Sequence, residues 1–171
     1  MTDTLTAGRI IELLGLKPHP TCGYVAETYR AQDRIMDEAL PTAYGGSRPF
    51  ASVLYFLVTP DAQIRLHRIR SDQMYHHYLG EPLDVLLLYP DGSSEVKVVG
   101  SDIAAGMRPQ LLVPGGTFHA ARITGEGSYS LLGTSVWLRA EPSDVELGNP
   151  AELAKACPAA AKQLAGMPAS R

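Results

Sequence analysis

The stretch PGGTFHAARI, residues 114–123, shows how this chain is built, because a Pro-Gly-Gly turn leads directly into a segment of strand-forming residues. Successive side chains of a β-strand point to opposite faces. His119 therefore shares a face with Thr117 and Ala121, whereas Arg122 lies on the other face and is expected to point to water. The stretch predicts a half-buried strand that carries a histidine on its inner side.

Short segments of the same kind extend over most of the chain. Thirteen prolines and sixteen glycines separate them, so turns recur every 8–12 residues or so, which is typical of an all-β sandwich or barrel. No alternation of strands and helices indicates a parallel nucleotide-binding sheet, and neither standard phosphate loop is present. The strands expected from the pattern cover residues 25–30, 50–59, 64–70, 73–79, 83–89, 95–99, 110–113, 117–123 and 129–138.

Two helices are expected outside the strand region. Thr6 is a good cap for a short N-terminal helix, and Asn149 is a good cap for a C-terminal helix over about residues 150–164. Residues 35–47 contain one proline and two glycines and predict a loop, a candidate lid over a pocket. We interpret residues 1–171 as a single domain with its core at about residues 13–147.

The composition of the chain limits which binding partners and which cellular compartment we expect. The chain has 171 residues with 15 Lys and Arg against 18 Asp and Glu, a net charge of −3, which argues against a nucleic-acid partner. No apolar run has the roughly 18 residues of a membrane helix, so no membrane partner is expected. Residues 1–5 lack the features of a secretion signal. Cys22 and Cys157 lie far apart and form no disulfide framework, which favours a cytoplasmic location.

The histidines are the main candidates for catalytic or metal-binding residues. In residues 64–70, the phase that turns Arg68 and Arg70 to water turns His67 inward, so His67 and His119 are expected to converge at the mouth of a small barrel. Imidazoles there can bind a metal or transfer protons near neutral pH. His76 and His77 are adjacent, so only one faces inward: strict alternation from Gln73 selects His77, and a bulge would select His76.

Two sets of residues resemble the motifs of a known family. His67, Gly80 and the stretch 114–119 look like the two sequence motifs of the cupin superfamily. More narrowly, SDQMYHHYLGEPL (residues 71–83) resembles the cupin-5 family, also called domain of unknown function 985. Further similar segments are residues 23–30, 90–92 and 106–110, and the resemblance spans roughly residues 13–145. It implies an all-β, cupin-type double-stranded β-helix (a jelly-roll barrel) with short N- and C-terminal helices, and a small-molecule substrate in its pocket.

The chain departs from the family pattern at its metal ligands. Aligned on the cupin motifs, the second metal histidine falls on Ile69 and the glutamate falls on Gln73, so only His67 and His119 remain as strong donors. A transition metal usually takes three or four protein ligands, and Gln73 offers only a neutral oxygen. No cofactor is therefore our main expectation. The alternative is a divalent metal held by His67, Gln73, His76 and His119.

These departures favour metal-independent isomerisation, epimerisation or cyclisation of a carbonyl-containing or sugar-like metabolite. One histidine would remove a proton next to a carbonyl, a tyrosine or the other histidine would return it, and the Gln73 amide would bind the enolate oxygen. The expected catalytic residues are His67, His119, Gln73 and Tyr75. The expected substrate-binding residues are His76, His77, Arg65, Tyr55 and Tyr129.

Two other functions are consistent with the same residues. A metal-dependent oxygenase or lyase would use His67, Gln73, His76 and His119. A non-catalytic module would bind a small ligand, with Arg65, Arg68 and Arg70 attracting an anionic group near the mouth. We also expect a homodimer, because the predicted strand at residues 50–59 is apolar on both faces and sheet edges need cover.

Overall fold

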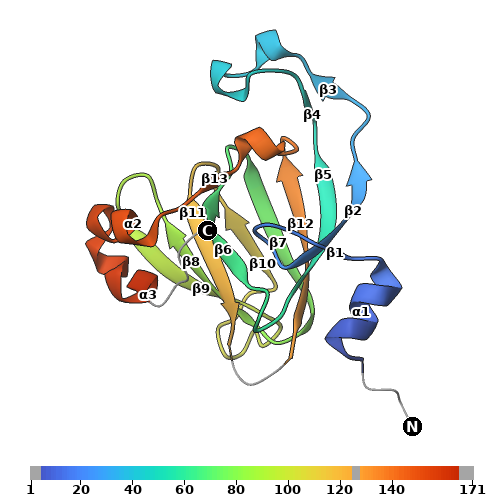
Figure 1. Ribbon diagram of the computed structural model, residues 1–171, viewed down its shortest axis with the longest axis vertical. Helices are drawn as coiled ribbons and strands as arrows, with labels where there is room; N and C mark the ends of the chain where they lie inside the picture. The colour runs from blue at the N-terminus through green and yellow to red at the C-terminus, as the bar shows by residue number, and fades with distance from the viewer. Residues whose placement is uncertain (1–4, 125–127, 166–171) are drawn as a thin grey trace.

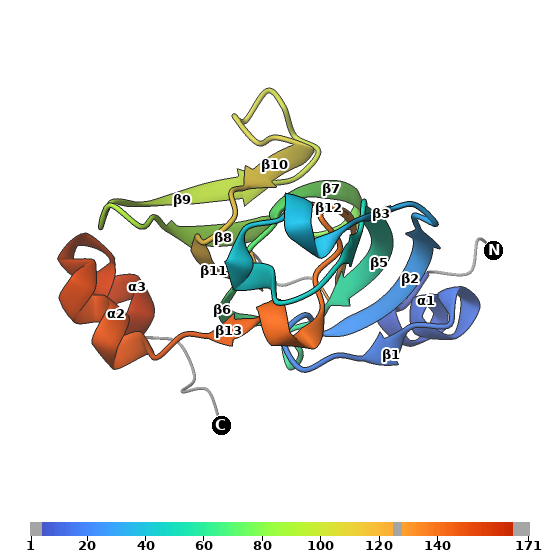
Figure 2. The same cartoon turned by 90° about the horizontal axis from the view of Figure 1, so that it is seen from above.

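Two antiparallel sheets face one another in this computed structural model of the chain, which describes residues 5–124 and 128–165. Sheet A has the strand order β1-β2-β5-β12-β7-β10, and sheet B has the order β13-β6-β11-β8-β9. Both sheets interleave strands that are distant in sequence, as a jelly roll does, and Figure 2 shows them as two layers. The main strands are β2 (Tyr24–Arg30), β5 (Ser52–Val58), β6 (Ile64–Arg68), β7 (Asp72–Gly80), β8 (Leu83–Leu88), β9 (Ser94–Val99), β10 (Gln110–Val113), β11 (Phe118–Ile123) and β12 (Ser130–Trp137).

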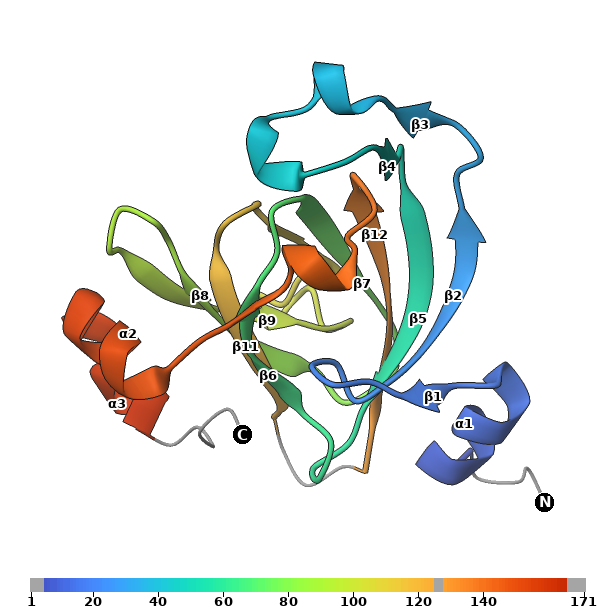
Figure 3. The same ribbon diagram turned by 45° about the horizontal axis from the view of Figure 1, so that its top comes forward.

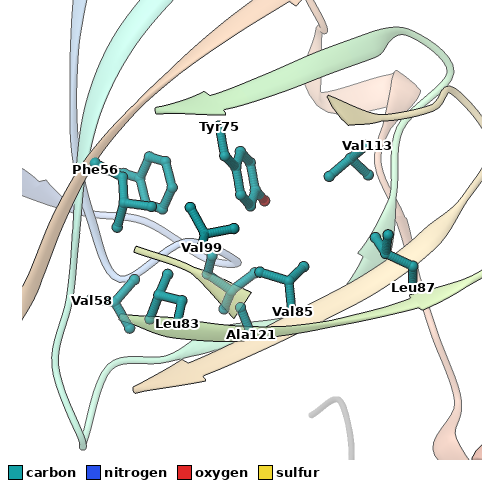
Figure 4. Packing of buried hydrophobic residues seen from close by; sticks show 11 residues of the cluster. Phe56, Val58, Tyr75, Leu83, Val85, Leu87, Val99, Val113 and Ala121 are labelled. Atoms are coloured by element: carbon teal, nitrogen blue, oxygen red, sulfur yellow. The ribbon is translucent and has the colours of Figure 1, made fainter. Parts of the chain in front are cut away.

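Every strand predicted from the sequence is present, with ends that differ by at most two residues. The alternating pattern predicts the strands correctly because one face of each strand packs into the space between the sheets. Phe56 and Tyr75 of sheet A point toward Leu83 and Val85 of sheet B, and all four side chains are 2% exposed or less (Figure 4). Four strands of two residues each were not predicted: β1 (Lys17–Pro18), β3 (Arg34–Ile35), β4 (Arg48–Pro49) and β13 (Glu146–Leu147).

Helices cover parts of the outer faces of both sheets. The predicted N-terminal helix is α1 (Ala7–Leu14), capped by the Thr6 side chain, which accepts a hydrogen bond from the Arg9 backbone N–H at 3.2 Å. It packs on the outer face of sheet A, where Ile10 contacts the cluster that contains Leu57 and Leu131. At the other end of the chain, two helices pack on the outer face of sheet B (Figure 1).

The C-terminal helix is not continuous, contrary to the prediction. It consists of α2 (Pro150–Ala156), a 3-10 turn at Pro158–Ala160 and α3 (Ala161–Ala165). Pro158 has no backbone N–H and disfavours helical geometry at Cys157, so the first helix ends there. The predicted Asn149 cap is present, since its side chain accepts hydrogen bonds from the backbone N–H groups of residues 151 and 152. None of the helices in the described part of the chain is long and apolar enough to cross a membrane.

Residues 31–51, between β2 and β5, leave the sheet and fold over one end of the barrel (Figures 1 and 3). We call this segment the cover. Instead of a plain loop it contains β3, β4 and two 3-10 turns, Asp37–Ala39 and Thr42–Tyr44. Its contacts with the rest of the chain include the Tyr44 hydroxyl, 3.4 Å from the Ser71 hydroxyl, and a hydrogen bond of 3.1 Å from the Arg139 backbone N–H to the Pro49 carbonyl oxygen. In addition, Arg48 pairs with Asp144.

The ion pair between Arg48 and Asp144 is bidentate and buried. Arg48 Nε and Nη2 each donate to a different oxygen of Asp144 at 2.9 Å, and the two side chains are 6% and 1% exposed. Burial alone would raise the pKa of Asp144, but the hydrogen bonds from Arg48 lower it overall. Because Asp144 lies in the segment that leads to β13, the pair ties the cover to sheet B.

We predict that Asp144→Ala destabilises the fold by about 3–5 kcal/mol, because the Arg48 guanidinium is left buried without its counter-charge. The apolar pair Arg48→Met with Asp144→Leu should lose much less, since no charge stays buried. Urea unfolding followed by circular dichroism measures both effects. As a control, Arg9→Ala removes an exposed ion pair with Glu12 and should change stability by less than about 0.5 kcal/mol. Equal losses for Asp144→Ala and Arg9→Ala would contradict the prediction.

Candidate active site

His67 on β6 and His119 on β11 meet, as the sequence predicted, but they lie buried in the interior of the barrel and not at its mouth. They are direct neighbours across the two strands, and their ring centroids lie 4.3 Å apart. His67 is 3% exposed and His119 is 0% exposed. Two imidazoles in contact therefore lie within an otherwise largely apolar interior.

A β-bulge sets the phase of β6. Residues 64 and 67 of β6 pair with residues 121 and 119 of β11, so β6 spans one extra residue between the two pairs. As a result Ile64 and His67 both face the core, although they are three residues apart. Leu66 lies on the outer face under the C-terminal helices, whereas simple alternation predicted that this face meets water.

Both rings are oriented by backbone carbonyl groups. His67 Nδ1 lies 2.7 Å from the Arg65 carbonyl oxygen, and His119 Nδ1 lies 3.4 Å from the Thr117 carbonyl oxygen. A carbonyl oxygen only accepts, so each Nδ1 carries the proton and each Nε2 presents a lone pair. The Gln73 amide donates to Nε2 of His119 at 3.3 Å, which places Gln73 where the sequence predicted it.

Burial keeps both histidines neutral. It lowers the pKa of His67 to about 4, against the opposing effect of the hydrogen bond to Arg65, and nearby His19 lowers it slightly further. The pKa of His119 lies well below its usual value because its ring is buried and His67 is adjacent. At neutral pH both rings are therefore uncharged, and their Nε2 atoms are unprotonated.

Three more polar side chains line the same region. Tyr75 is 2% exposed, its ring meets His119 edge-on with centroids 5.9 Å apart, and burial raises its pKa well above the usual value. Its phenol therefore remains a proton donor. Thr134 lies opposite Tyr75 on β12, and Thr117 lies two residues before His119. Within the described ranges, the hydroxyl oxygens of Thr117 and Thr134 are buried without a hydrogen-bond partner.

The sequence analysis did not identify these two threonines. Each is a polar residue at an inward position of an otherwise apolar stretch. The alternating pattern shows such positions, but it does not show which of them matter for function. A buried hydroxyl without a partner is costly, and it calls for an explanation such as a catalytic role or a bound water or ion. Thr117 and Thr134 therefore join His67, His119 and Tyr75 as candidate site residues.

The adjacent histidines on β7 separate as strict alternation predicted. His77 lies on the inward side, about 13 Å along the strand from Gln73, and its Nε2 donates to the Glu81 carbonyl oxygen at 3.2 Å. His76 lies on the outer face of sheet A, where its ring contacts the Ser135 hydroxyl and the Gln110 amide at 3.1 and 3.2 Å. Neither ring adjoins His119.

Three other predicted substrate-binding residues also lie apart from the histidine pair. Tyr55 is on the outer face of sheet A, where it packs edge-on against Tyr78. Tyr129 packs beside α1 in the outer cluster. Arg65 donates to the Pro20 carbonyl oxygen and lines a concavity of about 560 Å³ on the outer face of sheet B.

The predicted basic cluster does not form at the barrel mouth. Arg68 pairs with Glu146 at 2.7 and 2.9 Å and stacks on Phe118, with its guanidinium carbon 4.5 Å from the ring centroid. Arg70 approaches Asp144 at 3.6 Å. Both arginines are thus paired with carboxylates, as expected for a solvated outer surface.

The donor set does not fit a divalent transition metal. His67 and His119 present Nε2 lone pairs with their Nδ1 atoms held by carbonyl groups, which suits metal ligands. However, Gln73 is a neutral third donor and His76 lies on another face of the sheet. Across the described residues, no group of three or more His, Cys, Asp or Glu side chains is arranged to hold a metal.

The fold and the paired motifs agree with a known family. Residues 8–147 match the family model described as Cupin superfamily (DUF985). The chain belongs to this family, and its two sheets form the cupin jelly roll that the motif resemblance implied.

Similar proteins include two solved structures and one curated relative. A hypothetical protein from Leishmania major is 27% identical with a TM-score of 0.85, covering 95% of this chain and 98% of that one. Protein SO0799 from Shewanella oneidensis is 26% identical with a TM-score of 0.84, covering 98% and 100%. The uncharacterized protein YML079W of Saccharomyces cerevisiae is 31% identical over 110 residues, 60% of this chain and 54% of that protein. The chain thus matches about half the length of this yeast relative.

The buried histidines predict how stability depends on pH. The unfolded chain binds a proton at each histidine near pH 6.5, whereas folded His67 does so only near pH 4, so acidification favours unfolding. From pH 7 to pH 5, His67 alone should remove about 2 kcal/mol of stability, and His119 should add to that loss. Urea unfolding of the wild type, His67→Gln and His119→Gln at both pH values measures this. Each variant should show a smaller loss; an unchanged loss in both would contradict the assignment.

Proposed function

We propose that this protein is a metal-independent acid–base enzyme that isomerises, epimerises or cyclises a small carbonyl-containing or sugar-like metabolite. One observation carries the proposal: a contacting pair of neutral imidazoles, with an amide donor at one of them and a phenol beside it, is buried in an otherwise largely apolar barrel. Burying such groups costs free energy, and this cost argues against a purely structural role.

The arrangement supports a simple proton transfer. His67 Nε2 accepts a proton from the carbon next to the substrate carbonyl, and the C–H electron pair forms the enolate. The Gln73 amide donates a hydrogen bond to the enolate oxygen. The Tyr75 phenol, which burial keeps protonated, returns a proton to the other face or to the neighbouring atom, and His119 can do so only after its Nε2 has itself accepted a proton. Protonation of His67 next to a developing negative charge offsets the low pKa that burial gives its ring.

The interior favours an uncharged substrate. Within the described ranges, the only ionised side chains that are buried are Arg48 and Asp144, and they neutralise each other. A carboxylate or phosphate next to His119 would therefore have no counter-ion. Thr117 and Thr134 instead offer two hydroxyls, which suit the hydroxyl and carbonyl groups of a sugar or lactone.

The closed geometry requires an entry step. Because His119 is 0% exposed, a substrate reaches it only when part of the barrel end opens. The cover is the candidate element, since its Tyr44 contacts Ser71 only two residues before Gln73. We also propose a cytoplasmic location, where the free thiols of Cys22 and Cys157 would stay reduced.

We predict exchange of one carbon-bound hydrogen with solvent. The purified protein is incubated in D₂O with a panel of neutral aldoses, ketoses and sugar lactones, and deuterium uptake is followed by NMR. At least one compound should take up deuterium at the carbon next to its carbonyl group. His67→Gln and His119→Gln should each slow this at least about 100-fold, the usual contribution of a general acid or base. Val96→Gln, on the outer face of sheet B, is the control and should have no effect.

Two outcomes would contradict this function. Exchange that persists in both histidine variants would show that the pair is not the acid–base site. A panel compound that raises the melting temperature, loses this effect in His119→Gln and shows no exchange would favour a binding module instead.

The alternative, a metal-dependent oxygenase or lyase, has a separate test. Protein purified without a histidine tag should contain less than about 0.1 transition metal per chain, because a neutral third donor binds weakly. Gln73→Glu supplies the missing carboxylate beside Nε2 of His119 and should raise metal content after incubation with Zn²⁺ or Mn²⁺. Near-stoichiometric metal in the wild type would favour the metal-dependent alternative.

A further inference from the structure

The turn between β1 and β2, residues 19–23, carries His19, a histidine outside the candidate active site. A hydrogen bond of 2.7 Å from the His19 backbone N–H to the Gly23 carbonyl oxygen closes this turn. Gly23 has a φ of 64°, and a Cβ atom at this position would collide with the Leu57 carbonyl oxygen. The turn therefore has a defined shape and packs closely against β5.

The side chain of His19 holds the middle of the turn. Its Nδ1 lies 3.3 Å from the Thr21 backbone nitrogen and 3.3 Å from the Thr21 hydroxyl oxygen. A backbone N–H only donates, so Nδ1 of neutral His19 carries the lone pair and Nε2 carries the proton. The contact resembles an Asx turn, in which an Asn or Asp side chain accepts from the backbone N–H two residues later.

Thr21 joins this turn to sheet B at the bulge of β6, and Figure 3 shows the turn beside that strand. Thr21 is 3% exposed, and its carbonyl oxygen accepts a hydrogen bond from the Arg65 backbone N–H at 2.9 Å. Next to it, Cys22 pairs with Ile64 in an isolated antiparallel bridge. Arg65 lies within the bulge, where the pairing with β11 is interrupted, so the bond to Thr21 helps to fix its backbone.

Arg65 is also the residue that orients His67. Its carbonyl oxygen lies 2.7 Å from Nδ1 of His67, which donates to it. Three hydrogen bonds therefore connect the exposed residue His19 to the buried ring of His67, through the backbone of Thr21 and Arg65. A shift of the turn would move the Arg65 carbonyl group, and the ring of His67 with it.

We propose that His19 is a positioning residue for His67: its neutral ring holds the turn between β1 and β2, which places the Arg65 carbonyl group against Nδ1 of His67 and so aims Nε2 at the substrate. The catalytic part of this inference rests on the proposed function, because an acid–base group must be held close to its productive geometry. The structural part, in which one histidine controls the orientation of another, does not depend on that function.

Protonation of His19 releases this hold. An imidazolium has no lone pair at Nδ1, so it cannot accept the Thr21 N–H. Its charge also disfavours a proton on His67, whose pKa is lowered by His19, and burial lowers the pKa of His19 itself. Among the described residues, the other titratable or charged side chains of the turn and of the adjoining concavity are Cys22, Tyr24, Asp61, Arg65, Asp84 and Arg122.

We predict that the acceptor at residue 19 determines how firmly the His67 ring is held. His19→Leu removes the acceptor, whereas His19→Asn keeps one, because the Asn side-chain oxygen can accept the same N–H. Exchange of the His67 Nδ1 proton with water, measured by NMR on isotope-labelled histidine, should be about five- to tenfold faster in His19→Leu, the factor worth one hydrogen bond. In His19→Asn it should stay within about twofold of the wild type.

Circular dichroism checks that both variants fold. Any other pattern of the three exchange rates would overturn the proposal. In the deuterium-uptake assay of the proposed function, His19→Leu should be about five- to tenfold slower than His19→Asn. If no compound of the panel exchanges, the proposed function fails, while the measurements on the His67 ring still decide the role of His19.

A pH titration tests the same hold without His19→Leu. As the pH falls from about 7.5 to about 5, the His67 ring signals of the wild type should change with the midpoint at which His19 takes up its proton, although folded His67 itself is protonated only near pH 4. His19→Asn should lack this change, since its amide does not titrate. A step that is absent from the wild type or that persists in His19→Asn would overturn the proposal.

Discussion

Burial of two imidazoles in one apolar barrel is the constraint on which the rest of this site depends. The rings of His67 and His119 are in contact and shielded from water, so neither can be charged without a large penalty. Each therefore donates its Nδ1 proton to a backbone carbonyl group, which leaves the Nε2 atoms as acceptors. Burial keeps the two rings neutral, and the positions of two carbonyl groups set the tautomer of each ring.

The same constraint explains the role of residue 73. A carboxylate beside two neutral, buried rings would itself need a metal or a cation, and no third strong donor lies there among the residues that the structure describes. An amide satisfies His119 by donating a neutral hydrogen bond. A glutamine at this position is thus consistent with a cupin barrel whose polar groups work as acids, bases and hydrogen-bond donors.

The sequence predicted the strands and the inward positions of His67, His119, Gln73 and Tyr75, because the two-residue period of a strand can be read directly from residue order. It could not place the bulge in β6, which arises from pairing with β11, a partner that the local pattern does not reveal. Nor did it indicate that Tyr55 and Tyr129 lie on the outer face of sheet A, since β5 and the start of β12 are apolar on both faces. Arg65 lies on the outer face of sheet B because of the bulge in β6, which strict alternation does not include.

The cover was the part least accessible to local reasoning. Its prolines and glycines indicated only an irregular segment, whereas its position depends on Arg48 and its partner Asp144, which lies in a different part of the chain. The periodic pattern of apolar and polar residues does not predict contacts between distant segments, and these contacts are recognised only from the folded structure.

The cover also has a consequence for the order of biosynthetic folding. Arg48 and Asp144 are separated by 96 positions in the sequence, so the early segment cannot lock until the strand that precedes Asp144 has left the ribosome. Contacts of such long range close slowly because the intervening chain must first be organised. The cover is thus locked only after residue 144 has been synthesised, and a nascent chain that ends before this residue leaves the Arg48 guanidinium exposed to solvent.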